Sequence, residues 1–187
     1  INTGFGMLSE VQIAHENLEE LQINLIRSHA IGVGDPFDRE TVRAIMVLRA
    51  NVLAKGYSGI TLETFDKLIE LINKGVIPFI PSQGSVGARG DLAPLAHLAL
   101  VLCGEGYAVD ESGKRTDTSQ VLKGKGITPV TLKAKEGLAL INGTQVMTAV
   151  RILAVHRCRN LLKLADIAVT STIEATLGTD RAFDKKV

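Results

Sequence analysis

The feature that most constrains this fold is a long helical pattern, which runs from Thr144 to about Leu177. Its apolar residues occupy more than one face, whereas a helix on the surface of a small domain buries a single stripe. Such a helix must lie among other helices or against another subunit. A shorter helical repeat over 16–29 points the same way. The pattern therefore predicts a mainly α protein built as a helical bundle.

Two further helices are indicated by possible caps at their starts and glycines at their ends. Asp38 precedes a segment that ends at Gly56, and Thr61 precedes one that ends at Gly75. Side-chain oxygens of these types accept bonds from the free N–H groups of a first turn, and glycine adopts the backbone that ends a helix. The residues predicted to face inward are Val42, Ile45, Met46, Val52 and Leu53, then Leu62, Phe65, Leu68, Ile69 and Ile72.

A glycine-rich loop over 84–90 is the most unusual local feature. An extended link containing Pro78 and Pro81 leads into it, and the helix after it carries Pro94 in its first turn, where proline is tolerated. From local sequence, Asp91 is predicted to be the N-cap of that helix. The loop fits either a tight turn or an anion site, but it lacks the Lys-Ser/Thr pair of a phosphate-binding loop.

The rest of the chain contains one small β excursion and shorter helices. Residues 105–117 are predicted to form a surface hairpin with Ser112-Gly113 at its turn, and 119–123 and 133–140 to be helical. Asn142 opens the long helix with Gln145 three residues later, which is the spacing of a capping box.

Composition excludes several classes of function. The net charge is +1 and there are two Tyr, five Phe and no Trp, so a nucleic-acid surface is not expected. The apolar stretch 92–103 is 12 residues long, short of the roughly 20 that cross a bilayer, so no membrane partner is expected. Cys103 and Cys158 are predicted to be reduced core residues, which suits the cytoplasm.

The histidines give no metal site. His15, His97 and His156 show no ligand spacing and are predicted to be packing or surface residues. The sequence opens without Met, inside a glycine motif, and closes at no obvious boundary. We therefore expect an internal piece of a longer chain, or a processed one.

Five stretches in order along the chain resemble the aromatic amino acid ammonia-lyase and aminomutase family, and within it the histidine ammonia-lyases. They are INTGFG (1–6), RSHAIGVGDPF (27–37), GSVGARGDLAPLAHLAL (84–100), GEGYA (104–108) and KEGLALINGTQ (135–145). The resemblance implies a fumarase/aspartase-like helical bundle. It also implies an N-terminal lyase region over 1–143 and the start of the long central bundle over 144–187.

The resemblance also assigns roles to residues of the site. In the family an Ala-Ser-Gly triplet cyclises and dehydrates to a methylidene-imidazolone, with no external cofactor; here the triplet is Ala88, Arg89 and Gly90. Asp91 falls on the residue that assists ring formation. Two further residues are placed in the substrate site by the resemblance. His29 falls on its pocket histidine, and Asn142 falls beside the electrophile, where its amide can bind the substrate carboxylate or the ring. Gly4 lies in a loop that the family places near the active site.

Arg89 departs from the family pattern. Dehydration needs a β-hydroxyl that can leave as water, and arginine carries a carbon–carbon bond there instead. Ser85 cannot replace it, because it is not flanked by Ala and Gly. A non-cyclising relative, an engineered substitution and an error in the sequence all remain open.

The implied activity is elimination of ammonia from L-histidine to give urocanate, in histidine degradation. The resemblance further implies a cytoplasmic homotetramer with shared active sites. His29 alone has a simpler explanation as a hydrogen-bonded core residue, and Asn142 as a helix cap. The alternatives are a catalytically silent structural or regulatory relative, and a tyrosine ammonia-lyase or aminomutase.

Overall fold

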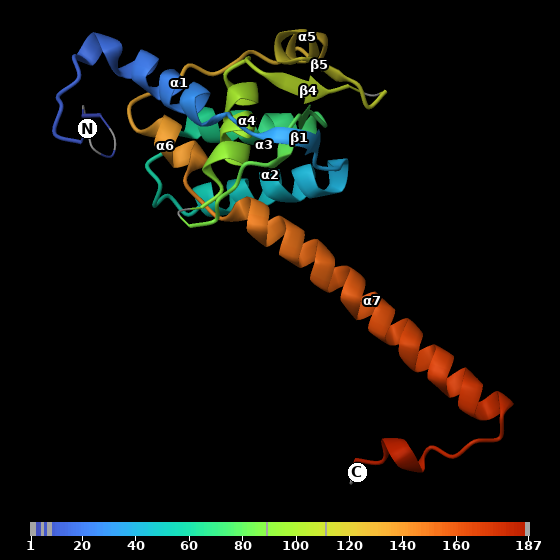
Figure 1. Cartoon of the computed structure of the whole chain (residues 1–187). Helices are drawn as coiled ribbons and strands as arrows, with labels where there is room; N and C mark the ends of the chain where they lie inside the picture. The colour runs from blue at the N-terminus through green and yellow to red at the C-terminus, as the bar shows by residue number, and fades with distance from the viewer. Residues whose placement is uncertain (1–2, 5, 7–8, 89, 111, 186–187) are drawn as a thin grey trace. The chain divides into compact units, whose positions relative to one another are not determined.

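A computed structural model describes residues 3–4, 6, 9–88, 90–110 and 112–185. The chain divides into two compact units, Ile1–Ala149 and Val150–Val187. A boundary between 143 and 144 stays a prediction. Figure 1 labels the helices α1 to α7 and the strands β1, β4 and β5, and the mainly α prediction is confirmed. The helices are α1 (Leu18–His29), α2 (Arg39–Leu53), α3 (Leu62–Asn73), α4 (Leu92–Leu102), α5 (Thr118–Gly124), α6 (Glu136–Ile141) and α7 (Gln145–Ala175).

The core of the first unit is built around α4, which packs against α1, α3 and α6. Most of its residues are buried, because its apolar side chains cover nearly the whole circumference. In α3 the buried stripe is Thr64, Leu68 and Leu71. Leu62 was predicted to face inward but is 78% exposed, since it lies off that stripe at the first position of the helix.

Two small sheets flank the helices. β1 (Val33–Pro36) pairs antiparallel with β3 (Pro81–Gln83), and β2 (Ile77–Pro78) pairs with the hairpin of β4 (Tyr107–Val109) and β5 (Arg115–Asp117). The hairpin predicted over 105–117 is confirmed. The extended prolines are confirmed too, but a two-residue strand is too short to show alternation, so the sequence did not reveal the pairing of β2.

The predicted caps of α2 and α3 are both present. The Asp38 carboxylate accepts a hydrogen bond from the Thr41 amide at 2.7 Å, and the Thr61 hydroxyl accepts one from the Thr64 amide at 3.3 Å. The helix predicted over 133–140 begins only at Glu136, because Lys135 has a left-handed φ of 74°. An L-residue in that conformation is incompatible with a continuing helical turn.

The second unit consists of the remainder of α7 and a short 3₁₀ turn, Arg181–Phe183. Cys158 was predicted to be a core residue but is exposed.

By length and composition alone, the stretch 136–175 is long and apolar enough to cross a bilayer, a test that the core helix of a soluble protein also passes. The exposed large apolar residues of this part of α7 are Val150, Ile152, Val155, Leu161, Leu162, Leu164, Ile167 and Val169.

Candidate functional site

A mostly apolar cavity of about 440 Å³ lies where the end of α1 meets the glycine-rich loop and the start of α4. It brings together three residues that the sequence predicted for one site, His29, Ala88 and Gly90. Arg89 lies outside the described residues. The lining is Ser28, His29, Ile31, Gly84, Val86, Ala88, Gly90, Leu92 and Ala93.

His29 is half-buried at the end of α1, and its backbone partner sets which ring nitrogen is available. The Nδ1 atom lies 2.8 Å from the Leu25 carbonyl oxygen. A carbonyl can only accept, so Nδ1 carries the hydrogen, and in the neutral ring Nε2 keeps a lone pair. The simpler role of a hydrogen-bonded helix residue is therefore met, and Nε2 is left as an acceptor for a ligand in the cavity.

The glycine-rich loop folds back on itself and packs against residue 143. Gly87 and Ala88 each form an isolated β-bridge with Gly90. Gly90 has a φ of 98°, and a Cβ there would lie 2.6 Å from the Gly143 carbonyl oxygen. Only glycine combines that backbone with that contact. The loop is thus a tight turn braced by the chain between α6 and α7.

Asp91 caps a helix, but not the one predicted. It occupies the N-cap position of α4 without a side-chain bond to that helix. Its fully buried carboxylate instead accepts hydrogen bonds from the Val146 amide at 2.9 Å and the Met147 amide at 3.0 Å, both in the first turn of α7. The Ser85 hydroxyl donates to the same carboxylate at 2.6 Å. The Asp91 amide donates to the Gly143 carbonyl, so both the backbone and the side chain of Asp91 bond to the segment at the start of α7.

Asn142 is exposed and ends α6 rather than opening α7. Its amide donates to the Leu138 carbonyl at 3.0 Å. The predicted capping box is absent, because that amide is already engaged and the Gln145 side chain accepts a bond from Arg49 at 2.8 Å. Asn142 does not line the cavity. It is joined to the cavity wall through its neighbour Gly143, whose carbonyl contacts the glycine-rich loop.

Arg49 is the residue of this region that sequence reasoning missed. It is 1% exposed on α2, and its guanidinium donates to the carbonyl oxygens of Ala139 and Asn142 and to the Gln145 side chain. Burial lowers the pKa of Arg49 to about 10. A signal was present, because an arginine falls in the inward stripe of α2, four residues after Ile45.

Gly4 is not brought to the cavity. It is buried, and its amide donates to the Val11 carbonyl at 3.0 Å, within the N-terminal segment. The role implied for it stays a prediction.

Among the described residues, no group of three or more His, Cys, Asp or Glu side chains is placed to hold a metal ion. His97 is half-buried and its Nε2 accepts a hydrogen bond from the Gly32 amide at 3.1 Å. Burial and the charge of Arg115 lower the pKa of His97. His97 therefore packs in the fold, as predicted, and its lowered pKa favours the neutral ring, while His15 and His156 are exposed.

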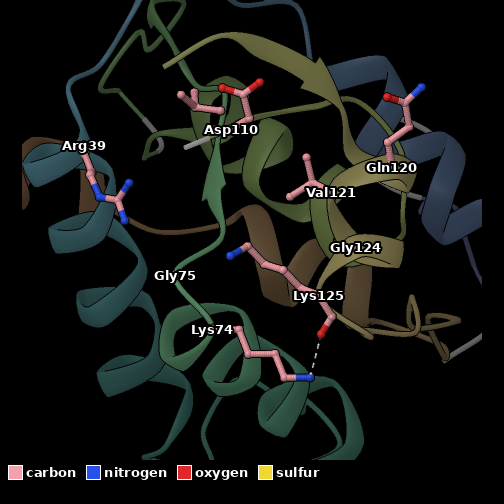
Figure 2. Close-up of a pocket in the computed structure, with 9 residues that line it drawn as sticks. Arg39, Lys74, Gly75, Asp110, Gln120, Val121, Gly124 and Lys125 are labelled. Carbon is pink, nitrogen blue, oxygen red and sulfur yellow. Dashed lines mark hydrogen bonds between the residues drawn. The ribbon is translucent and has the colours of Figure 1, made fainter. Parts of the chain in front are cut away.

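Another cavity, of about 390 Å³, lies away from these residues, between the start of α2, the end of α3 and one side of α5 (Figure 2). Its charged groups are largely engaged with their own surroundings. The Lys74 ammonium donates to the Lys125 carbonyl and pairs with Glu70. Hydrogen bonds within its turn, led by that from Ser112, lower the pKa of Asp110 to about 2.

Comparison with known proteins gives concordant matches. A sequence model described as aromatic amino acid lyase matches residues 1–187. The histidine ammonia-lyase of Alkaliphilus oremlandii is 58% identical and that of Geobacillus kaustophilus 51% identical, each over all of this chain and 37% of the relative. The chain thus spans little more than a third of the length of these curated relatives.

Solved structures agree. Histidine ammonia-lyase from Trypanosoma cruzi superposes with a TM-score of 0.88 at 48% identity, covering 95% of this chain and 35% of that one. Tyrosine aminomutase from Streptomyces globisporus gives a TM-score of 0.86 at 43% identity, covering 94% of this chain and 32% of that one.

Proposed function

The chain belongs to the aromatic amino acid lyase family, and on that premise we propose that its site serves the elimination of ammonia from L-histidine to give urocanate. The observation that carries this proposal is the cavity that His29 shares with Ala88 and Gly90. The curated relatives named histidine ammonia-lyases, at 51–58% identity, support histidine as the substrate.

His29 accounts for selection among aromatic amino acids. Its Nε2 lone pair accepts a hydrogen bond from an imidazole N–H or a phenol O–H, whereas a phenyl ring offers no donor. A buried acceptor left unpaired costs about 1–3 kcal/mol. The site therefore discriminates against phenylalanine. Asn142 does not line this cavity, and its proposed role in binding the substrate carboxylate rests on the family resemblance.

The residues present do not fit the ring that the family builds. The central position of the triplet is Arg89, which has no β-hydroxyl to leave as water. Ala88, Gly90 and Asp91 are all of the types that the family uses, so the mismatch is confined to one side chain.

Arg89 favours a second function, that of a catalytically silent relative with a structural or regulatory role. The experiment that separates the two compares the full-length protein with its Arg89→Ser variant for urocanate formation and for L-histidine binding. Urocanate from both proteins supports a lyase. Urocanate only after Arg89→Ser supports a lyase site silenced by one residue. If neither protein binds L-histidine or forms urocanate, the histidine proposal is refuted.

Tyrosine chemistry is the remaining alternative, because a phenol also satisfies His29 and a tyrosine aminomutase is among the similar structures. Competition between L-histidine and L-tyrosine in one reaction separates the two. Urocanate as the sole product excludes tyrosine as the substrate.

We further propose a cytoplasmic homotetramer that needs no external cofactor and binds neither nucleic acid nor a membrane. Support for the assembly of several copies comes from the large apolar side chains that α7 exposes between 150 and 169, which a second copy would cover. Sedimentation of the full-length protein as a monodisperse monomer would contradict this assembly.

A further inference from the structure

The connection between α6 and α7 is only three residues long, 142–144, and it carries the group proposed to bind the substrate carboxylate. Asn142 itself is exposed, with an extended backbone at φ −88° and ψ 101°. The direction of its side chain therefore depends on how firmly its peptide is held.

Arg49 holds that peptide from the side of α2. One nitrogen of its guanidinium, Nη1, donates to the Asn142 carbonyl at 3.1 Å and to the Gln145 side-chain oxygen at 2.8 Å. The other, Nη2, donates to the Ala139 carbonyl in the last turn of α6. One buried cation thus joins the end of one helix to the start of the next.

The charge of Arg49 suits this position. The carbonyl end of a helix carries partial negative charge, so a cation there is stabilising. Burial lowers the pKa of Arg49 to about 10, which still leaves the guanidinium charged at neutral pH. A Cβ on Gly143 would overlap both Nη1 of Arg49 and the Gln145 side chain, so this residue has to be glycine for the cation to come so close.

Asp91 holds the same connection with a negative charge, where Arg49 uses a positive one. Its carboxylate accepts hydrogen bonds from the Val146 and Met147 amides in the first turn of α7, where an anion is stabilising. The Asp91 amide donates to the Gly143 carbonyl. The connection is therefore fixed between a cation on the carbonyl end of α6 and an anion on the amide end of α7.

We propose that Arg49 is a positioning residue that fixes the Asn142 peptide, and thereby aims the Asn142 amide at the carboxylate of an amino acid substrate. The proposal rests on the proposed function for the identity of that substrate. Lysine cannot replace Arg49, because a single ammonium nitrogen does not span acceptors that two nitrogens of a planar group reach together.

The test uses the full-length protein, with Arg49→Lys as the variant and Arg43→Lys as its control. Arg43 lies on the same helix and also donates to a helix carbonyl, that of Ile72, but is exposed and remote from the connection. Calorimetry measures binding of L-histidine and of imidazole, which lacks the carboxylate. Arg49→Lys should weaken L-histidine binding about tenfold, the scale of one hydrogen bond to a charged group, and leave imidazole within about twofold. Arg43→Lys should change neither.

Other outcomes overturn the proposal. Equal losses for both ligands show general damage rather than positioning, and no loss for either shows that Arg49 has no such role. In the Asn142→Ala background, Arg49→Lys should have no further effect on L-histidine, and an additive loss contradicts the proposal. If Arg49→Lys does not fold, Gln145→Met removes one partner of the guanidinium and should give a weaker loss with the same selectivity.

A measurement without ligand separates this proposal from the proposed function. Amide hydrogen exchange over residues 139–147 should speed up in Arg49→Lys but not in Arg43→Lys. If the unaltered protein binds no L-histidine, the proposed function fails, and exchange still decides whether Arg49 holds the connection. Unchanged exchange refutes the positioning role whatever the ligand does.

Discussion

Replacing Asp91 by alanine should remove the cap of α7 and destabilise the protein substantially. The carboxylate is fully buried and serves two amides, those of Val146 and Met147. Met147 is 37% exposed, so water can reach its surroundings, whereas Val146 is buried and its amide would lose its partner outright. One orphaned buried amide costs about 1–3 kcal/mol, and loss of the anion at the helix start adds about 1 kcal/mol. We therefore expect Asp91→Ala to lower the free energy of unfolding by about 3 kcal/mol.

Asp91→Asn isolates the contribution of the charge. Its side-chain oxygen can still accept from both amides, and its NH₂ group can donate to the Ser85 hydroxyl. We expect this variant to lose only about 1 kcal/mol. A matched control is Asp38→Ala, which removes an ordinary cap that accepts from one amide of its own helix, at a cost of about 1 kcal/mol.

Urea denaturation of the three variants and the unaltered protein measures these differences, provided that the m-values agree. The expected order of destabilisation is Asp91→Ala, then Asp91→Asn and Asp38→Ala together. An Asp91→Ala loss no larger than that of Asp38→Ala would refute the claim that Asp91 caps α7. A loss in Asp91→Asn as large as in Asp91→Ala would refute the separation of charge from hydrogen bonding.

Three further predictions follow from single residues. Gly90→Ala should destabilise the protein by more than about 2 kcal/mol in urea denaturation, because the added Cβ meets the Gly143 backbone carbonyl. The control Gly113→Ala, at φ 84° with open space around it, should cost only about 1 kcal/mol. Equal costs for the two variants would contradict the contact at Gly90. Cys103 should resist iodoacetamide at pH 8 until the protein is unfolded, because burial raises the pKa of its thiol to about 12 and leaves about one molecule in ten thousand as thiolate; labelling of native protein at the rate of a free thiol would refute this. The lowered pKa of His97 means that the unfolded chain takes up the proton first as the pH falls. The contribution of His97 to the free energy of unfolding is therefore complete above about pH 6.5 and is lost as the pH falls below that value. His97→Gln should flatten the dependence of the free energy of unfolding on pH in this range, and an unchanged slope would be the contrary result.

The helices could be predicted from sequence where the deciding interactions are local. Asp38 and Thr61 each bond to an amide three residues away, so the starts of α2 and α3 are encoded within one turn. Leu62 shows the limit of the same method. Helical spacing identifies a stripe, but only the packing of the other helices decides which edge of the stripe is covered.

The candidate site could be predicted only in part. His29 and the glycine-rich loop were assigned to one site through the family resemblance, and the cavity brings them together. Apart from Ser85, the side-chain partners of Asp91 and Arg49 lie 55 to 96 residues away, and nothing in the neighbouring sequence indicates them. Buried charged groups such as these are chosen by the surrounding fold rather than by local preference.

The separation in sequence between Asp91 and α7 also sets when the glycine-rich loop can fold during synthesis of the chain. A ribosome adds about 5–20 residues per second, so the 55 residues between Asp91 and Val146 take roughly 3–11 s to make. Until then the carboxylate has neither of its α7 partners, and Gly90 has no carbonyl of residue 143 to pack against. During synthesis the glycine-rich loop therefore reaches its final packing only after the helices on either side of it and the start of α7 have been made.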